Sequence, residues 1–230
     1  MRPDLGAPRP EPLSFGPVRL LCISDIHGHA AALAAVLATA ERTGYGKILV
    51  AGDLCFPGPD PLETWRRLNQ AGAVCVQGVG DRALATLDLS GVRPRSVHER
   101  ARLDRLTAVR TELGDLILHK LAHLPPALRL ALEDGRELLL VHGSPTDAME
   151  SFTHDMSDEE VMALIGDDPA DVIVCGGSHV PFDRTVAGVR VLGVGSVGEA
   201  PGGHADATLI TTSADGVDAV QLVIPLGQAA

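Results

Sequence analysis

The stretch VRLLCISDIHGH at residues 18–29 decides the fold, because an apolar run ends directly in a cluster of polar side chains. Residues 18–23 include β-branched members and predict a buried strand, and the alanine- and leucine-rich segment from His29 to Arg42 has helical spacing. A strand that leads into a helix is the unit from which parallel sheets are built. Asp25 and His27 thus follow the first strand, where open α/β sheets present their functional loops.

The same order of strand, loop and helix recurs along the first half of the chain. An apolar run at 47–52 precedes a helix at 61–71, and a second run at 73–77 precedes a helix that follows Asp81. Between residues 95 and 124, leucines and alternating charges predict one or two surface helices. We therefore expect a parallel sheet in this half.

The second half predicts hairpins. Apolar runs at 127–133 and 137–142 flank an Asp-Gly turn, residues 157–166 begin like a capped helix, and 171–176 predict a buried strand followed by further hairpins. The expected fold class is α/β, a four-layer αββα sandwich of two mixed β-sheets flanked by helices. We expect a flexible Pro-rich extension over 1–17 and a single domain over 18–226.

Composition excludes several classes of protein. A net charge of −11 and 3% aromatic residues argue against a nucleic acid partner, which needs basic and stacking side chains. The sequence contains neither an apolar run long enough to span a membrane nor the apolar core of a secretion signal. Four scattered cysteines without a C-x-x-C pair fit a reduced, cytoplasmic protein.

Five polar residues each follow a predicted strand: Asp25, His27, Asp53, His142 and His179. Singly, each has an ordinary explanation as a helix cap, a turn residue or a hydrogen-bonded loop histidine. Together they would bring carboxylates and imidazoles into one place, which favours a bound cation. Asp25 and His27 lie two residues apart, so on an extended segment both side chains would point to the same side.

These residues belong to longer motifs, which are SDIHGH at 24–29, GDLCFPGPDP at 52–61, QGVGDRAL at 77–84, VHGSP at 141–145 and CGGSHVPF at 175–182. The set resembles the calcineurin-like metallophosphoesterases, specifically the small prokaryotic phosphodiesterases and phosphatases. The resemblance implies two metal sites that share one Asp. The first would comprise Asp25, His27, Asp53 and His179, and the second would use Asp53 and His142.

The chain departs from that family pattern at the second site. Val79 stands where the family has the Asn of its G-N-x-D motif, and Gly177 stands where it has the first His of G-H-x-H. Gly80 occupies the position of a His that often donates a proton. None of these side chains binds a metal or donates a hydrogen bond. We therefore expect one well-formed site for Mn, Fe or Zn and a weakened second site.

Other polar residues are candidates for catalysis or phosphate binding. His142 and Asp81 are possible catalytic groups. His29 is either a replacement general acid, an auxiliary metal ligand or a solvent-facing residue at a helix start. Arg82 and Arg184 suit bidentate phosphate binding, although surface ion pairs explain them equally well. The arginines between residues 93 and 110 alternate with acidic residues and predict a solvated helix face.

Two functions follow from the sequence. The first is weak, mononuclear hydrolysis of a phosphate mono- or diester by a metal-activated water, with a small phosphorylated substrate. The alternative is a catalytically inactive relative that binds a phosphorylated ligand or a protein partner. The motifs distinguish neither the substrate nor the oligomeric state.

Overall fold

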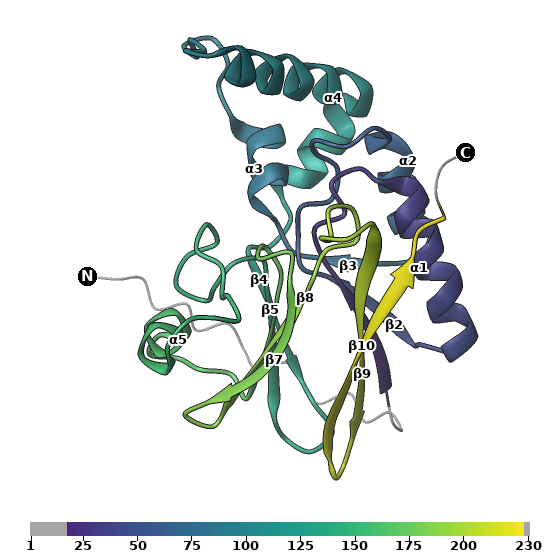
Figure 1. The fold of residues 1–230 in the computed structure, drawn as a ribbon, viewed down its shortest axis with the longest axis vertical. Coiled ribbons are helices and arrows are strands. Elements are labelled where there is room, and N and C mark those ends of the chain that lie inside the picture. The colour runs from purple at the N-terminus through teal and green to yellow at the C-terminus, as the bar shows by residue number, and fades with distance from the viewer. Residues whose placement is uncertain (1–17, 228–230) are drawn as a thin grey trace.

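The computed structural model describes residues 18–227 and contains two five-stranded sheets with helices outside them (Figure 1). The expected extension over 1–17 lies outside the described residues. The first sheet has the strand order β10-β9-β1-β2-β3, and its strands are β1 (Val18–Ile23), β2 (Lys47–Val50), β3 (Val74–Cys75), β9 (His204–Ser213) and β10 (Gly216–Pro225). β1, β2 and β3 run parallel, as the strand-helix pattern predicts, whereas β9 is antiparallel to β1.

The second sheet has the order β4-β5-β6-β8-β7. Its strands are β4 (Ala127–Ala131), β5 (Glu137–Val141), β6 (Val172–Cys175), β7 (Pro181–Val186) and β8 (Val189–Val194). β4 and β5 form the predicted hairpin, β7 and β8 form another, and β5, β6 and β8 are parallel to one another.

Alternation of side chains along the strands produces the layers. Leu20 and Cys22 of β1 face the second sheet, where they share a core cluster with Leu138 and Leu140 of β5. The intervening Leu21 and Ile23 pack in the cluster that includes the helices on the outer side of the first sheet. Successive residues of a strand point to opposite faces, so one apolar run supplies both an inter-sheet core and a sheet-helix core. The predicted sandwich is therefore confirmed.

The helices cover the outer faces of the sheets. α1 (Ala30–Thr43) and α2 (Pro61–Gln70) pack in the core cluster of the first sheet, and α5 (Asp158–Ile165) packs against the second. Ser157 caps α5, because its hydroxyl accepts a hydrogen bond from the Glu160 N–H while Glu160 reaches back to the cap. None of the helices within residues 18–227 has both the length and the apolar character needed to cross a membrane.

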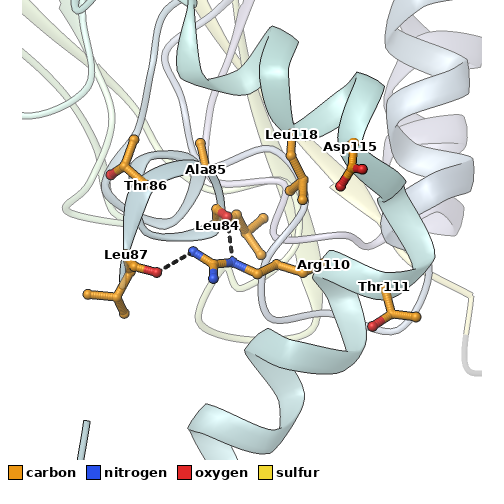
Figure 2. Close-up of a pocket in the computed structure, with 8 residues that line it drawn as sticks. All are labelled: Leu84, Ala85, Thr86, Leu87, Arg110, Thr111, Asp115 and Leu118. Atoms are coloured by element: carbon orange, nitrogen blue, oxygen red, sulfur yellow. Dashed lines mark hydrogen bonds between the residues drawn. The ribbon is translucent and has the colours of Figure 1, made fainter. Parts of the chain in front are cut away.

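Two further helices stand above the strand ends (Figure 1). α3 (Val79–Thr86) begins two residues before Asp81, and α4 (Val97–Ala122) continues through a break at Gly114, where φ is 70°. Arg110 joins these helices, since its guanidinium donates to the Leu84 and Leu87 carbonyls at 2.7 Å each (Figure 2). These carbonyls lie at the end of α3, where the helix leaves them without partners of its own. The bonds tie α4 to the carboxyl-terminal end of α3.

Candidate metal centre

Four loops meet above the two sheets and bring the predicted polar residues together. The Asp25 N–H donates to the Gly52 carbonyl at 3.1 Å and the His27 N–H to the Asp53 carbonyl at 2.9 Å, which ties the loops after β1 and β2 together. The Gly176 N–H donates to the His142 carbonyl at 2.9 Å and links the loops after β6 and β5. All of these loops leave the carboxyl ends of parallel strands, where such sheets place their sites.

The first group of candidate ligands consists of Asp25, His27 and His179. The Nε2 atoms of the two histidines lie 3.1 Å apart, and Asp25 Oδ1 is 3.2 Å from His179 Nε2 and 3.6 Å from His27 Nε2. Asp25 is fully buried, and His27 is almost so. The three ligand atoms therefore converge on one point.

The second group consists of Asp25, Asp53 and His142. Asp53 Oδ2 lies 3.6 Å from His142 Nε2 and 4.0 Å from His27 Nδ1. The two groups share Asp25, whereas the resemblance implies that Asp53 is shared. Asp53 Oδ1 is turned the other way and accepts the Gly80 N–H at 2.6 Å.

The chemistry of these donors fits a divalent cation. Nδ1 of His27 binds the Phe56 carbonyl at 2.6 Å and Nδ1 of His142 binds the Ala51 carbonyl at 2.7 Å, so both rings carry the proton on Nδ1. This leaves the Nε2 lone pairs directed into the site, as in metal-bound histidines. Asp25 Oδ1 is buried without a hydrogen-bond partner of normal geometry, which a cation would supply.

The backbone at the site is held in an uncommon conformation. Asp25, His27, Asp53 and His179 have φ between 51° and 58°, and they are four of the five non-glycine residues with positive φ in the described chain. Asp25 and His27 are therefore not on an extended segment, and that expectation was wrong, although their side chains do converge. Each such residue costs about 1–3 kcal/mol, and such strain is concentrated at functional sites.

Charges inside the site shift several pKa values. Burial alone would raise the pKa of Asp25, but contact with His179, the charge of His142 and the Gly177 N–H lower it below its usual range. Contact with the Asp25 carboxylate raises the pKa of His179. Burial opposes protonation of His142, yet the charges of Asp53 and Asp25 raise its pKa overall. Without an ion, the carboxylates thus favour protonation of His142 and His179.

These pKa shifts predict that the stability of the ion-free protein and the stabilisation by a metal ion change in opposite directions with pH. In ion-free protein, His142 and His179 are protonated in both folded and unfolded chains below pH 6.5, so their stabilisation is complete there and is lost as pH rises through their raised pKa values. Metal binding needs neutral imidazoles and becomes more favourable over the same range. The Tm in EDTA should therefore fall above pH 6.5, and the increase in Tm caused by Mn²⁺ should grow. If the increase in Tm caused by Mn²⁺ became smaller with rising pH, this account would be contradicted.

Asp81, a predicted catalytic candidate, has a structural position. Its fully buried carboxylate accepts the Leu54 and Gly78 N–H groups at 3.0 Å each, which fixes the loop after β2 against the start of α3. Burial, reinforced by the charge of Asp53, raises the pKa of Asp81 to about 6. The geometry indicates that Asp81 holds Asp53 in place.

The remaining candidates lie outside both groups of ligands. His29 is the residue that precedes α1, and its ring lies against Gly198. Arg184 binds the Met156 carbonyl and pairs with Asp158, which ties β7 to α5. Arg82 is exposed and does not line the pocket at the metal groups. The structure therefore does not bring either arginine to the metal groups.

Two residues at the site were missed from the sequence. Glu199 Oε2 lies 3.6 Å from His27 Nε2 and 3.8 Å from His179 Nδ1, at the opening of a pocket of about 490 Å³. Arg102 of α4 lines the same pocket, with its guanidinium 5.7 Å from the centre of the Phe56 ring. Arg102 is solvent-exposed, as the predicted arginine face implies, and it also lines this pocket, whereas the expectation was wrong for Arg110, which binds α3. The pocket in Figure 2 contains none of the metal groups.

The positions expected to weaken a second site carry no polar side chain at the pocket. Val79 and Gly80 line the pocket without a polar side chain. Gly177 has φ of 74°, and a Cβ atom there would stand 2.1 Å from Ser151 Oγ. A histidine at position 177, where the family pattern places one, would therefore crowd Ser151 and strain the left-handed backbone.

Comparisons with known proteins agree with this geometry. A family model described as the calcineurin-like phosphoesterase superfamily domain matches residues 18–215. A hypothetical protein from Pyrococcus horikoshii OT3 is 21% identical with a TM-score of 0.76, covering 92% of this chain and 89% of that chain. A metallophosphoesterase from Sphaerobacter thermophilus is 22% identical with a TM-score of 0.69, covering 89% and 88%. The likenesses to these two solved structures show the fold alone. No curated protein sequence matches significantly.

Proposed function

This chain belongs to the calcineurin-like phosphoesterase superfamily, and on that premise we propose that it hydrolyses phosphate mono- or diesters with one resident divalent ion. The observation that carries the proposal is the convergence of Asp25 Oδ1 and the Nε2 atoms of His27 and His179 within 3.6 Å of one another. Repulsion and desolvation would disfavour that arrangement unless a cation or shared protons were present.

The residues of the chain have distinct tasks in this mechanism. Asp25, His27, Asp53 and His179 would hold the ion, and the Phe56 carbonyl orients His27 for it. A bound Mn, Fe or Zn ion lowers the pKa of a water molecule and polarises the phosphate ester. His142 has its Nε2 directed toward Asp53, and in this proposal it would contact the phosphate or return a proton to the leaving group.

The mononuclear part of the proposal rests on Val79, Gly80 and Gly177. Replacing Val79 with Asn restores a ligand of the family pattern in the pocket wall, so a second ion should bind more tightly. We expect kcat/KM to rise by about tenfold or more in excess Mn²⁺, the effect of one added group at the site. Val97→Asn is the control, since Val97 is 82% exposed on α4. If kcat/KM changed equally in Val79→Asn and Val97→Asn, the proposal of a deficient second site would be contradicted.

The same three positions support the alternative of a catalytically inactive relative that binds a phosphorylated ligand or a protein. Hydrolysis of p-nitrophenyl phosphate and its bis ester in Mn²⁺ separates the two. The hydrolase is supported if His142→Ala reduces turnover and the exposed control His98→Ala leaves turnover unchanged. Wild-type turnover no higher than that of Asp53→Asn would leave only the binding protein.

Arg102 should contribute to substrate binding. It is the arginine that lines the metal pocket, and a charged hydrogen bond to phosphate is worth about tenfold or more in affinity. Arg102→Ala should raise KM by about that factor with a smaller change in kcat, and Arg102→Lys should recover part of it. Arg100→Ala, an exposed neighbour on α4 that does not line the pocket, should behave like wild type. An unchanged KM in Arg102→Ala would show that Arg102 does not contribute to substrate binding.

A further inference from the structure

A second, apolar pocket opens beside the metal centre. It has a volume of about 280 Å³ and lies between α3, α4 and the loop that joins them. Its apolar lining includes Val79, Ala83, Leu87, Val92, Leu103 and Leu106. Phe56, Val79, Gly80 and Arg102 line both this pocket and the metal pocket, so the two spaces adjoin.

The boundary between the two pockets is apolar. Val79 and Gly80 form part of it, at the positions where the metal centre lacks polar side chains. Arg102 stands at the same boundary, over the Phe56 ring. A ligand with its phosphate at the metal groups and near Arg102 would direct its organic group past Val79 into an apolar space.

Apart from Arg102, which faces the metal pocket as well, the charged side chains at this pocket are already engaged. Glu99 accepts the Arg95 N–H at 2.5 Å, and Arg93 Nη1 donates to the Ser90 carbonyl at 3.2 Å and the Val92 carbonyl at 3.1 Å. A nucleobase brings donors and acceptors that need partners on burial, whereas an aromatic or aliphatic group needs none. The lining therefore suits an apolar group better than a nucleobase.

We propose that this apolar pocket binds the organic group of the substrate, and that the substrates are phosphate esters of compact aromatic or aliphatic alcohols. The proposal rests on the proposed function, because it places the phosphate at the metal centre. Hydrogen bonds from Arg110 to α3 keep α4 in position to form the outer wall.

Binding of non-hydrolysable phosphonates tests the proposal without turnover. Phenylphosphonate and methylphosphonate would be titrated calorimetrically into the full chain loaded with Mn²⁺. Burial of the ring should make phenylphosphonate bind about tenfold or more tightly than methylphosphonate. Leu103→Asp should abolish this difference while methylphosphonate affinity stays within about twofold of wild type, because only the ring reaches Leu103.

Two further variants complete the test. Ala83→Leu fills the pocket without adding a charge and should also reduce the preference for the phenyl group. Leu116→Asp is the control, because Leu116 is 72% exposed on α4 and lines neither pocket. Its preference should equal that of wild type.

The outcomes separate this inference from the proposed function. Ester hydrolysis with no preference between the phosphonates would overturn the apolar pocket and leave the hydrolase intact. A preference that Leu103→Asp and Ala83→Leu both abolish, without hydrolysis of any ester, would support the pocket and refute the hydrolase. Failure of both phosphonates to bind, or a preference that survives both variants, would overturn the inference.

Discussion

Replacing Asp25 with Asn should remove the metal ion and lower kcat/KM by at least about 10³-fold, the upper range for loss of one charge-stabilising group. Asp25 is the residue that both candidate ligand groups share. Its Oδ1 faces the Nε2 atoms of His27 and His179, and its Oδ2 accepts the Gly177 N–H at 2.8 Å. An amide has the same shape but no negative charge to hold a cation between two imidazoles.

Metal content by elemental analysis and steady-state hydrolysis would be measured together for this variant. Asp206→Asn is the matched control, since Asp206 is also buried and belongs to neither ligand group. Its metal content should equal that of wild type. Full metal content in Asp25→Asn would show that the ion is held elsewhere.

Gly78→Ala should be strongly damaging, although Gly78 is not a ligand. A Cβ atom at Gly78 would stand 2.2 Å from both the backbone nitrogen and Oδ1 of Asp53. Because one of the crowded atoms is backbone, the loop after β2 would have to move. Overpacking of this kind typically lowers the free energy of unfolding by about 1–3 kcal/mol, occasionally more, and here it would also displace a ligand.

Urea unfolding and metal content test this prediction. Gly91→Ala is the control, because an added Cβ at Gly91 would meet nothing within 4 Å and its φ is not in the left-handed region. That change should leave stability unchanged or raise it by up to about 1 kcal/mol. Wild-type stability and metal content in Gly78→Ala would show that the loop after β2 is not tightly packed.

The sequence predicted the layers and the convergence of the candidate ligands because both depend on local patterns. Alternating core residues such as Leu20 and Leu21 specify a strand buried on both faces. Asp25 follows β1 of the first sheet and His179 follows β6 of the second, so topology places each at the carboxyl ends of its own sheet, and the packing of the two sheets brings them together. Parallel strands order their carboxyl ends in this way whatever the intervening loops contain.

The remaining features depend on contacts that no local pattern reveals. Arg102 reaches the site only because α4 folds back over α3, and Arg100, two residues earlier on the same helix, is exposed and does not line the pocket. Asp81 belongs to a sequence motif and was a reasonable catalytic candidate. In the structure its carboxylate is buried and accepts hydrogen bonds from the Leu54 and Gly78 N–H groups. Its GVGD context, at the start of a helix, was the available signal for a capping role.

The most direct test of the central claim is the number of metal ions per chain in wild-type protein, measured by elemental analysis after equilibration with Mn²⁺, Zn²⁺ or Fe²⁺ and removal of free ion. The geometry of Asp25, His27, Asp53 and His179 predicts about one ion per chain, and none in Asp25→Asn. Wild-type protein that retains no ion under any of these conditions would contradict the account.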